Sequence, residues 1–262
     1  MDKEQMAKPP QSWEFRSKPS WQRLIIMLGG VTINFILAII IYIGLAYSYG
    51  SSSISLDSID DGFVITNPIL TEAGFETGDK IITVDGQKLD TYSDLRKSII
   101  GSTNYQVERN GNIIEIQLPV DFLGKLSSSD DMSSFEFRMP FIIQSVAEES
   151  LNKDYDIRQG DRIVSVNGQA TKYVDQLVPI LEQNNNRTIE VEILRDSFTI
   201  KKTLNVNEDG KLGIMHGATV QNMVDLGLME VSNNSYSLLE SIAVGTNNFV
   251  SFMGFYFDQL VA

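Results

Sequence analysis

The chain has 262 residues, of which 42% are hydrophobic and 21% charged, which is the composition of a folded protein with one large domain or two ordinary ones. It contains no cysteine and one histidine, which excludes disulfide frameworks, thiol nucleophiles and any zinc site built from several histidines. The formal net charge of -13 argues against a nucleic-acid partner, because a phosphate backbone requires a basic surface.

A basic segment and a long uncharged segment open the chain. Residues 1–23 carry five lysines and arginines against three acids, and residues 24–49 carry no charged side chain. About 20 helical residues cross the hydrocarbon core of a membrane, so a transmembrane helix is predicted over 24–49. The positive-inside rule places residues 1–23 in the cytoplasm and the following part on the opposite side. A cleaved signal peptide is the alternative, because Ala46 and Ser48 are small residues at the spacing that signal peptidase prefers.

The exported part contains an internal repeat. At an offset of 82 residues, Gly78–Gln87 aligns with Gly160–Gln169, and six of the ten positions are identical. In each copy a Gly-Asp turn precedes a short strand that closes at Asp85-Gly86 or Asn167-Gly168, sequences typical of tight turns. A repeat of this length indicates two copies of one domain-sized module. A helix is then predicted over 94–100 and 174–181, and strand pairs over 105–120 and 188–206.

Each copy resembles a PDZ domain in its circularly permuted bacterial form, because one helix and two strands follow the sequence Gly-Asp-x-Ile-x-x-Val-x-Gly. PDZ domains bind a peptide as an added strand beside a helix, and a loop of backbone amides can bind its terminal carboxylate. Pro140 lacks an N–H, so the second loop offers one donor fewer. Core packing is the other interpretation of Phe63 and Phe141. The resemblance implies two sets of peptide-binding residues, one in each copy: Gly62, Phe63, Val64, Leu95 and Ile99 in the first, and Phe141, Ile142, Leu177 and Leu181 in the second.

The fold class predicted from these patterns is an α+β membrane protein with one N-terminal transmembrane helix, two PDZ-like β-rich domains and a C-terminal membrane-associated helix. Residues 236–262 carry Glu240 and Asp258 as their only charges, and we expect a helix on the membrane surface, with a second span as the alternative. His216 is predicted to be a surface or packing residue. The predicted segments are 1–23 cytoplasmic or interfacial, 24–49 transmembrane, 54–121 first PDZ-like domain, 122–137 linker, 138–214 second PDZ-like domain, and 236–262 membrane-associated helix.

The entrance to the uncharged segment carries the pattern F-x2-K-x3-Q-R-x6-G-x3-N-F, formed by Phe15, Lys18, Gln22, Arg23, Gly30, Asn34 and Phe35. This pattern, followed by two exported PDZ-like domains, resembles the second transmembrane region and the layout of the site-2 protease family, the intramembrane zinc metalloproteases of peptidase family M50. That family binds zinc through two histidines of an HExxH helix and an aspartate of a later motif, and this chain contains neither motif. Val31 is a second departure, because many relatives have proline there.

The resemblance implies that the chain is the central part of an intramembrane protease in the inner (cytoplasmic) membrane of a bacterium. Zinc-activated water in the intact enzyme would cut single-pass membrane proteins, such as anti-sigma factors and signal peptides. The PDZ pair would bind peptide termini or exclude bulky ectodomains. Gly30 and Asn34 would lie near the active site, or would serve helix packing alone. The alternative is a non-enzymatic membrane-anchored tandem-PDZ adaptor, and the chain by itself is expected to be inactive.

Overall fold

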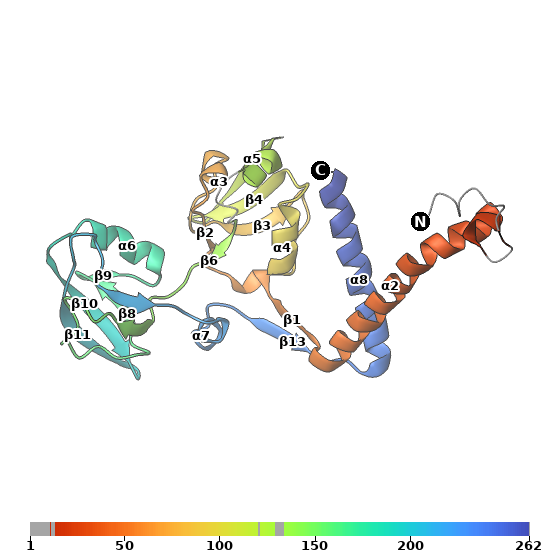
Figure 1. Ribbon diagram of the computed structural model, residues 1–262. Helices are drawn as coiled ribbons and strands as arrows, with labels where there is room; N and C mark the ends of the chain where they lie inside the picture. The colour runs from red at the N-terminus through yellow and green to blue at the C-terminus, as the bar shows by residue number, and fades with distance from the viewer. Residues whose placement is uncertain (1–10, 12–13, 120, 129–133, 262) are drawn as a thin grey trace, which may run out of the picture. The chain divides into compact units, whose positions relative to one another are not determined.

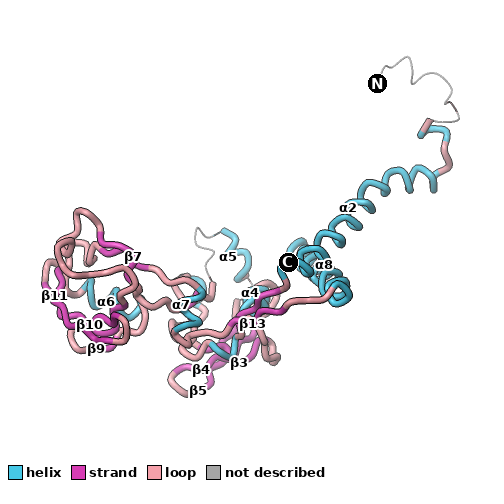
Figure 2. The backbone as a smooth tube through the Cα atoms, turned by 90° about the horizontal axis from the view of Figure 1, so that it is seen from below, coloured by secondary structure: helices cyan, strands magenta, loops and turns pink. Residues whose placement is uncertain are grey.

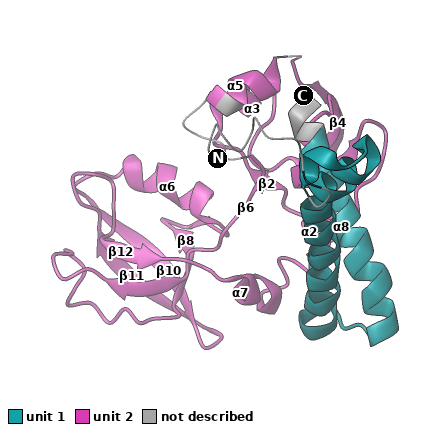
Figure 3. Cartoon of the chain, turned by 45° about the vertical axis from the view of Figure 1, so that its right-hand side comes forward, with its two compact units in different colours: residues 1–52, 233–261 teal, residues 53–232, 262 magenta. Residues whose placement is uncertain are grey.

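The computed structural model of the protein describes residues 11, 14–119, 121–128 and 134–261. The chain forms two compact units, with residues 1–52 and 233–261 in unit 1 and residues 53–232 in unit 2 (Figure 3). Val120 and parts of the predicted segments 1–23 and 122–137 lie outside the described residues.

Unit 1 is a pair of antiparallel helices that lie side by side (Figures 1 and 3). The Phe249 ring lies 5.6 Å from that of Phe35 and 6.0 Å from that of Tyr42, measured between ring centroids. The helices approach closely because Gly245 has no Cβ, which would lie 2.6 Å from the Cα of Ile43. The helical elements of this unit are η1 (Phe15–Ser17), α2 (Ser20–Tyr49) and α8 (Leu238–Val261).

The α2 helix begins at Ser20, one turn before the uncharged segment, and ends at Tyr49, where Gly50 caps it with a φ of 67°. Among the described residues, α2 is the one helix that is both long and apolar enough to cross a membrane. The chain passes between the units through a two-stranded sheet of β1 (Ser51–Ile54) and β13 (Val231–Asn234).

Unit 2 contains two modules, each with its own hydrophobic core: module 1 (residues 56–137) and module 2 (residues 141–216). Figure 2 shows that both are rich in strands, with α4 or α6 beside them. Module 1 contains η2 (Leu56–Ser58), β2 (Phe63–Val64), α3 (Pro68–Glu72), β3 (Lys80–Val84), α4 (Tyr92–Ser98), β4 (Asn104–Arg109), β5 (Asn112–Gln117), α5 (Phe122–Ser128) and β6 (Glu136–Phe137). Module 2 contains β7 (Ile143–Val146), β8 (Arg162–Val166), β9 (Gln169–Ala170), α6 (Val174–Glu182), β10 (Thr188–Arg195), β11 (Phe198–Asn205) and β12 (Ile214–His216), and α7 (Val220–Asp225) follows it.

The repeated sequence produces the same framework in both modules. The antiparallel hairpins β4-β5 and β10-β11 pair with β3 and β8 respectively, and the short strands pair as β2 with β6 and β7 with β12. The predicted tight turns are confirmed, because both central residues have positive φ, 47° and 76° at Asp85-Gly86 and 49° and 78° at Asn167-Gly168.

The aspartate of each Gly-Asp turn does more than form the turn. Asp79 and Asp161 are each 1% exposed, and each accepts hydrogen bonds from an arginine on the sheet. Arg109 Nε lies 2.6 Å from Asp79, and Arg195 Nε lies 2.7 Å from Asp161. Burial by itself would raise the pKa of Asp161, but the hydrogen bonds and charge of Arg195 lower it. A buried ion pair therefore fastens the repeated turn to the sheet in both modules.

The segment 122–137, predicted as a linker, belongs to the core of module 1 over its described residues. Phe122 and Phe135 are 3% and 1% exposed, and β6 extends the module through its pairing with β2. The serines and aspartates of the segment suggested a loop, but the phenylalanines that flank them bury apolar surface, which outweighs the polar composition.

Candidate functional site

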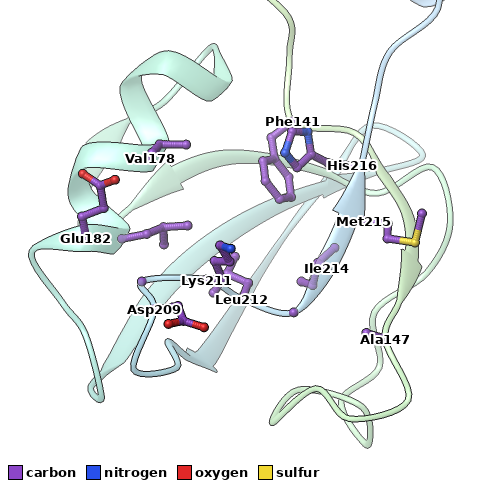
Figure 4. A pocket seen from close by; sticks show the side chains of 13 residues that line it. Phe141, Ala147, Val178, Glu182, Asp209, Lys211, Leu212, Ile214, Met215 and His216 are labelled. Atoms are coloured by element: carbon purple, nitrogen blue, oxygen red, sulfur yellow. The ribbon is translucent and has the colours of Figure 1, made fainter.

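A cavity of about 400 Å³ lies in module 2, between α6 and the chain that enters β12 (Figure 4). This cavity, called the groove below, has the size and the mostly apolar lining of a ligand site. Its lining includes the charged residues Glu182, Asp209 and Lys211. The apolar side chains on its walls are Phe141, Val178, Leu181, Leu212 and Ile214.

One edge of β12 is open beside the groove. The Ala147 N–H donates a hydrogen bond of 2.9 Å to the carbonyl of Gly213, on the side where β7 lies. Alternate residues of a strand direct their backbone groups to opposite edges, so those of Ile214 face the edge away from β7. Within the described part of the chain, β7 is the only strand that pairs with β12. An open strand edge beside a helix is the arrangement that accepts a peptide as an added strand.

The loop before β12 presents unused backbone donors. Over the described residues, the N–H groups of Leu212 and Gly213 donate to no acceptor. The fully buried Asn152 fixes the loop, because its Nδ2 donates to the carbonyl of Leu212 at 2.9 Å, while Asn207 Oδ1 accepts from the N–H of Lys211 at 2.7 Å. Successive free amides beside a lysine can bind a carboxylate.

Gly213 is required at this point for two reasons. Its φ of 66° is strained for any other residue, and a Cβ there would lie 2.6 Å from Ser150 Oγ. The Lys211 side chain forms no ion pair with any described residue, so its charge remains available to an anionic group in the groove.

His216, the one histidine of the chain, lies at the end of β12 and lines the groove. Its ring centroid is 4.3 Å from that of Phe141 (Figure 4). Partial burial lowers the pKa of His216, so the imidazole is neutral at pH 7. Predicted as a surface or packing residue, it packs on Phe141 and also offers ring nitrogens to a ligand.

Module 1 has a closed counterpart of the groove. The 82-residue offset relates Val174 of α6 to Tyr92 of α4. The Tyr92 hydroxyl donates to the carbonyl of Phe135 at 2.6 Å, and its ring lies 4.3 Å from that of Phe137. The acceptor is the carbonyl of Phe135, directly before β6. A peptide added as a strand at this edge would need that carbonyl, and Tyr92 already occupies it. Burial raises the pKa of Tyr92, consistent with this enclosed position.

The predicted peptide-binding residues are distributed between groove and core. Phe141 and Leu181, each 4% exposed, belong to the core of module 2 and also line the groove. Phe63, Leu95 and Leu177 are at most 1% exposed and lie in the two cores without lining it. A bound peptide cannot reach those core residues without disrupting the module. The other predicted positions are buried or half-buried and do not line the groove: Gly62, Val64, Ile99 and Ile142.

The loop of Lys211, Leu212 and Gly213 was not predicted from the sequence, because the resemblance to PDZ domains implies residues 139–143, around Pro140, as the loop and strand of the second groove. The available signal was Leu212-Gly213-Ile214, a glycine between apolar residues directly before a strand. It matches the Gly-hydrophobic pattern expected of a carboxylate-binding loop, but it lies at the opposite end of the module sequence.

Gly30 and Asn34 lie on α2, and both are exposed over the described residues. A Cβ at Gly30 would meet nothing within 4 Å. The contacts with α8 involve Phe35 and Tyr42. Gly30 is therefore not needed for a close approach of α2 to a neighbouring helix in this structure.

The residues present do not fit a zinc ion. No group of three or more histidines, cysteines, aspartates or glutamates that could hold a metal occurs among the described residues. The whole sequence contains His216 as its one imidazole, and the groove places it beside Phe141.

Comparison with known proteins gives the following similarities. The family model described as "Peptidase family M50" matches residues 1–262. Proteins named "Putative zinc metalloprotease" from Brucella suis, Staphylococcus aureus and Clostridium perfringens are 32%, 27% and 33% identical over 39%, 42% and 44% of this chain. The matched parts cover 27%, 25% and 31% of those relatives, so the alignment spans about a quarter to a third of their length.

A solved structure, the PDZ domain of an SdrC-like protein from Listeria monocytogenes, is also similar to part of the chain. It is 14% identical with a TM-score of 0.27, and the match covers 35% of this chain and 97% of that domain.

Proposed function

The chain belongs to peptidase family M50, and from this membership we propose that it is the central part of an intramembrane zinc metalloprotease whose module 2 binds a peptide terminus of the substrate. The match of the family over residues 1–262 is the observation that carries the proposal. Zinc and its ligands belong to parts of the enzyme that this chain does not contain, because its residues do not fit the metal.

The proposed location is the inner (cytoplasmic) membrane of a bacterium. The α2 helix spans the bilayer with the basic residues before it in the cytoplasm, and the acidic modules are periplasmic. Gly30 and Asn34, which are both exposed on α2, face the catalytic helices of the intact enzyme. The α8 helix lies at the membrane surface or enters the bilayer beside α2.

The proposed substrates are single-pass membrane proteins, among them anti-sigma factors and signal peptides, whose ectodomains another protease has already shortened. Such trimming creates a new carboxyl terminus. The groove offers such a terminus an open strand edge, two free amides at Leu212 and Gly213, and the charge of Lys211. The apolar walls of α6 select an apolar terminal side chain.

The protease proposal is tested with the complete coding sequence, expressed and reconstituted in proteoliposomes with a single-pass substrate. We expect cleavage within the membrane segment that stops when a chelator removes zinc, detected by mass spectrometry of the products. The present chain, treated in the same way, is expected to retain no stoichiometric zinc and to cut nothing. A complete protein without HExxH and without cleavage would instead indicate a membrane-anchored adaptor.

The peptide proposal is tested by titration of the chain in detergent micelles with a short synthetic peptide that ends in leucine. We expect the free carboxyl form to bind more tightly than the carboxamide form, because the carboxamide lacks the negative charge for Lys211. Equal affinity of the two forms would refute recognition of the terminus.

A further inference from the structure

The helix that forms one wall of the groove depends on module 1 for its position. Most helices begin with a side chain that accepts a hydrogen bond from the first turn. In α4 of module 1, Thr91 does so, because its Oγ1 accepts from the N–H of Asp94 at 3.2 Å. The residue in the same position before α6 is Tyr173, whose side chain accepts no such bond and points elsewhere. The local cap of α6 is Gln176, whose Oε1 accepts from the N–H groups of Lys172 and Tyr173, and the N–H groups of the first turn gain no side-chain acceptor from Tyr173.

Tyr173 reaches residues of module 1 instead. It is 4% exposed, and its hydroxyl donates to Asp61 Oδ2 at 2.5 Å. Lys172 forms an ion pair with the same carboxylate. The hydrogen bonds from Lys172 and Tyr173 lower the pKa of Asp61, so the carboxylate is charged at neutral pH. Asp61 lies two residues before β2 of module 1, and the start of α6 is therefore tied to the first module.

Arg138, in the segment between the modules, makes the second connection. Its Nε lies 3.2 Å from Asp175 Oδ2 in the first turn of α6, and its Nη1 donates to the carbonyl of Asp61 at 3.2 Å. The guanidinium also lies 4.6 Å above the Tyr173 ring, a cation–π arrangement. The side chains of Arg138 and Asp175 are 13% and 17% exposed, so solvent screens this pair only weakly.

The internal hydrogen bonding of α6 is weak where these contacts hold it. Pro179 lies inside this nine-residue helix and has no N–H to donate to the carbonyl of Asp175, one turn earlier. Short helices depend on tertiary contacts for their stability. The next turn of α6 carries Val178 and Leu181, which are walls of the groove.

We infer that module 1 positions the groove of module 2 by holding the first turn of α6, with Asp61 and Arg138 as positioning residues that do not touch the peptide. The two modules then have different tasks. Module 1 serves as an anchor, and module 2 binds. This inference rests on the proposed function only for the identity of the groove ligand.

The first test is amide hydrogen exchange of the full chain in detergent micelles, with Asp61→Asn compared with Asp60→Asn. Asp60 is the adjacent aspartate, 81% exposed and paired with Lys80, so its substitution is the matched control. We expect exchange in residues 174–178 to rise about tenfold in Asp61→Asn, with strands β10 and β11 unchanged, and no rise in Asp60→Asn. Unchanged exchange in α6 of a folded Asp61→Asn chain overturns the inference.

The second test is peptide affinity with the same leucine-terminated peptide. We expect Asp61→Asn and Tyr173→Phe to weaken binding about tenfold, which corresponds to about 1.4 kcal/mol, while Asp60→Asn stays within twofold of the parent chain. Tyr173→Phe keeps the ring and removes only the hydroxyl, so it decides the matter if Asp61→Asn fails to fold. Faster exchange in α6 without weaker binding overturns the positioning role. A parent chain that binds no peptide refutes the proposed function, and the exchange experiment still decides whether module 1 holds α6.

Discussion

Modules 1 and 2 share a framework and differ in the groove beside the helix. In module 2 the edge of β12 is open and a cavity of about 400 Å³ lies beside it. In module 1 Tyr92 fills the corresponding place, with its hydroxyl on the Phe135 carbonyl and its ring on Phe137. A duplicated fold can thus keep its packing in both copies while a single side chain closes the binding site of one copy.

The helices α4 and α6 also differ in what stabilises their first turns. The α4 helix is capped by its own Thr91, whereas α6 begins at Tyr173 and is held by Asp61 of the other module. Thr91 thus caps the helix of the closed module from within that module, whereas the helix of the open module adds contacts with its neighbour to its own cap at Gln176. This difference suggests that duplication allowed one copy to support and the other to bind.

The largest expected effect is on the free energy of unfolding, and it concerns the Asp–Arg ion pair that both modules share. Asp161→Asn and Asp79→Asn each remove the buried carboxylate that binds an arginine of the sheet. Arg195 then keeps only the more exposed Asp156, and Arg109 only the more exposed Glu76. We expect each substitution to lower the free energy of unfolding by about 3 kcal/mol. Urea denaturation followed by far-UV circular dichroism measures the loss. The exposed pair of Asp60 and Lys80 is the control, for which Asp60→Asn is expected to cost about 0–1 kcal/mol. A small effect at Asp161 alone would mean that the frameworks are not equivalent.

Opening the closed module is the next test. Tyr92→Val gives α4 the residue that α6 has at Val174, and we expect it to lower stability by about 2 kcal/mol because ring contacts and a hydrogen bond are lost. Calorimetric titration should then find two peptide sites per chain where the parent has one. Tyr92→Phe, which loses the hydroxyl alone, is expected to cost about 1 kcal/mol and to keep the ring in place. One site in the Tyr92→Val chain would mean that another group closes module 1.

Disabling the open module is the converse test. Val178→Asp places a negative charge on the groove wall, and we expect peptide affinity to fall at least about tenfold, or about 1.4 kcal/mol. Fluorescence anisotropy of a labelled peptide measures it. The offset of 82 residues relates Val178 to Arg96 of α4, so Arg96→Asp is the matched control and should leave affinity unchanged. Loss of binding in the control rather than in Val178→Asp would move the site to module 1.

The smallest expected effect is a pH dependence confined to module 2. The folded-state pKa of His216 lies below its ordinary value of 6.5, so the unfolded chain binds the proton more readily. The stabilisation from neutral His216 is present above pH 6.5 and is lost as the pH falls below that value. Asp61 and Asp161 have lowered pKa values and titrate below their ordinary value of 3.8, outside this range.

We therefore expect the melting temperature to decline slightly from pH 7 to about pH 5, and His216→Gln to abolish the decline. Differential scanning calorimetry over this range measures it. A decline that persists in His216→Gln would assign the titration to a carboxylate and remove the difference between the modules.

Much of the architecture could be predicted from local patterns. The absence of charge over residues 24–49 predicts a long apolar helix, and the structure contains α2 there, starting four residues earlier. The repeat predicts two similar modules, because the same sequence forms the same local structure twice. Asp85-Gly86 and Asn167-Gly168, for example, both form tight turns with positive φ. The pattern of Phe15 to Phe35 and the order of the segments indicated the family, which the match over the whole chain confirms.

The candidate groove could be predicted only in part. The resemblance to PDZ domains implied Phe141 and Leu181, and both residues line the groove. The loop of Lys211 to Gly213 was not predicted, because the permuted module brings the end of its sequence beside its beginning. Phe63 and Phe141 both lie in the core of their module, but only Phe141 also lines the groove, and periodicity by itself cannot predict that difference.

Local interactions determine the helices and the hairpins, since each depends on residues a few positions apart. The duplication is visible in the sequence itself as a repeat. Tertiary structure alone decided which module is open. Tyr92 closes the first module through Phe135, which is 43 residues away, and Asp61 holds the groove helix of the second through Tyr173, which is 112 residues away. Such pairs leave no periodic trace in the sequence, because the partners meet only after each module has packed its core.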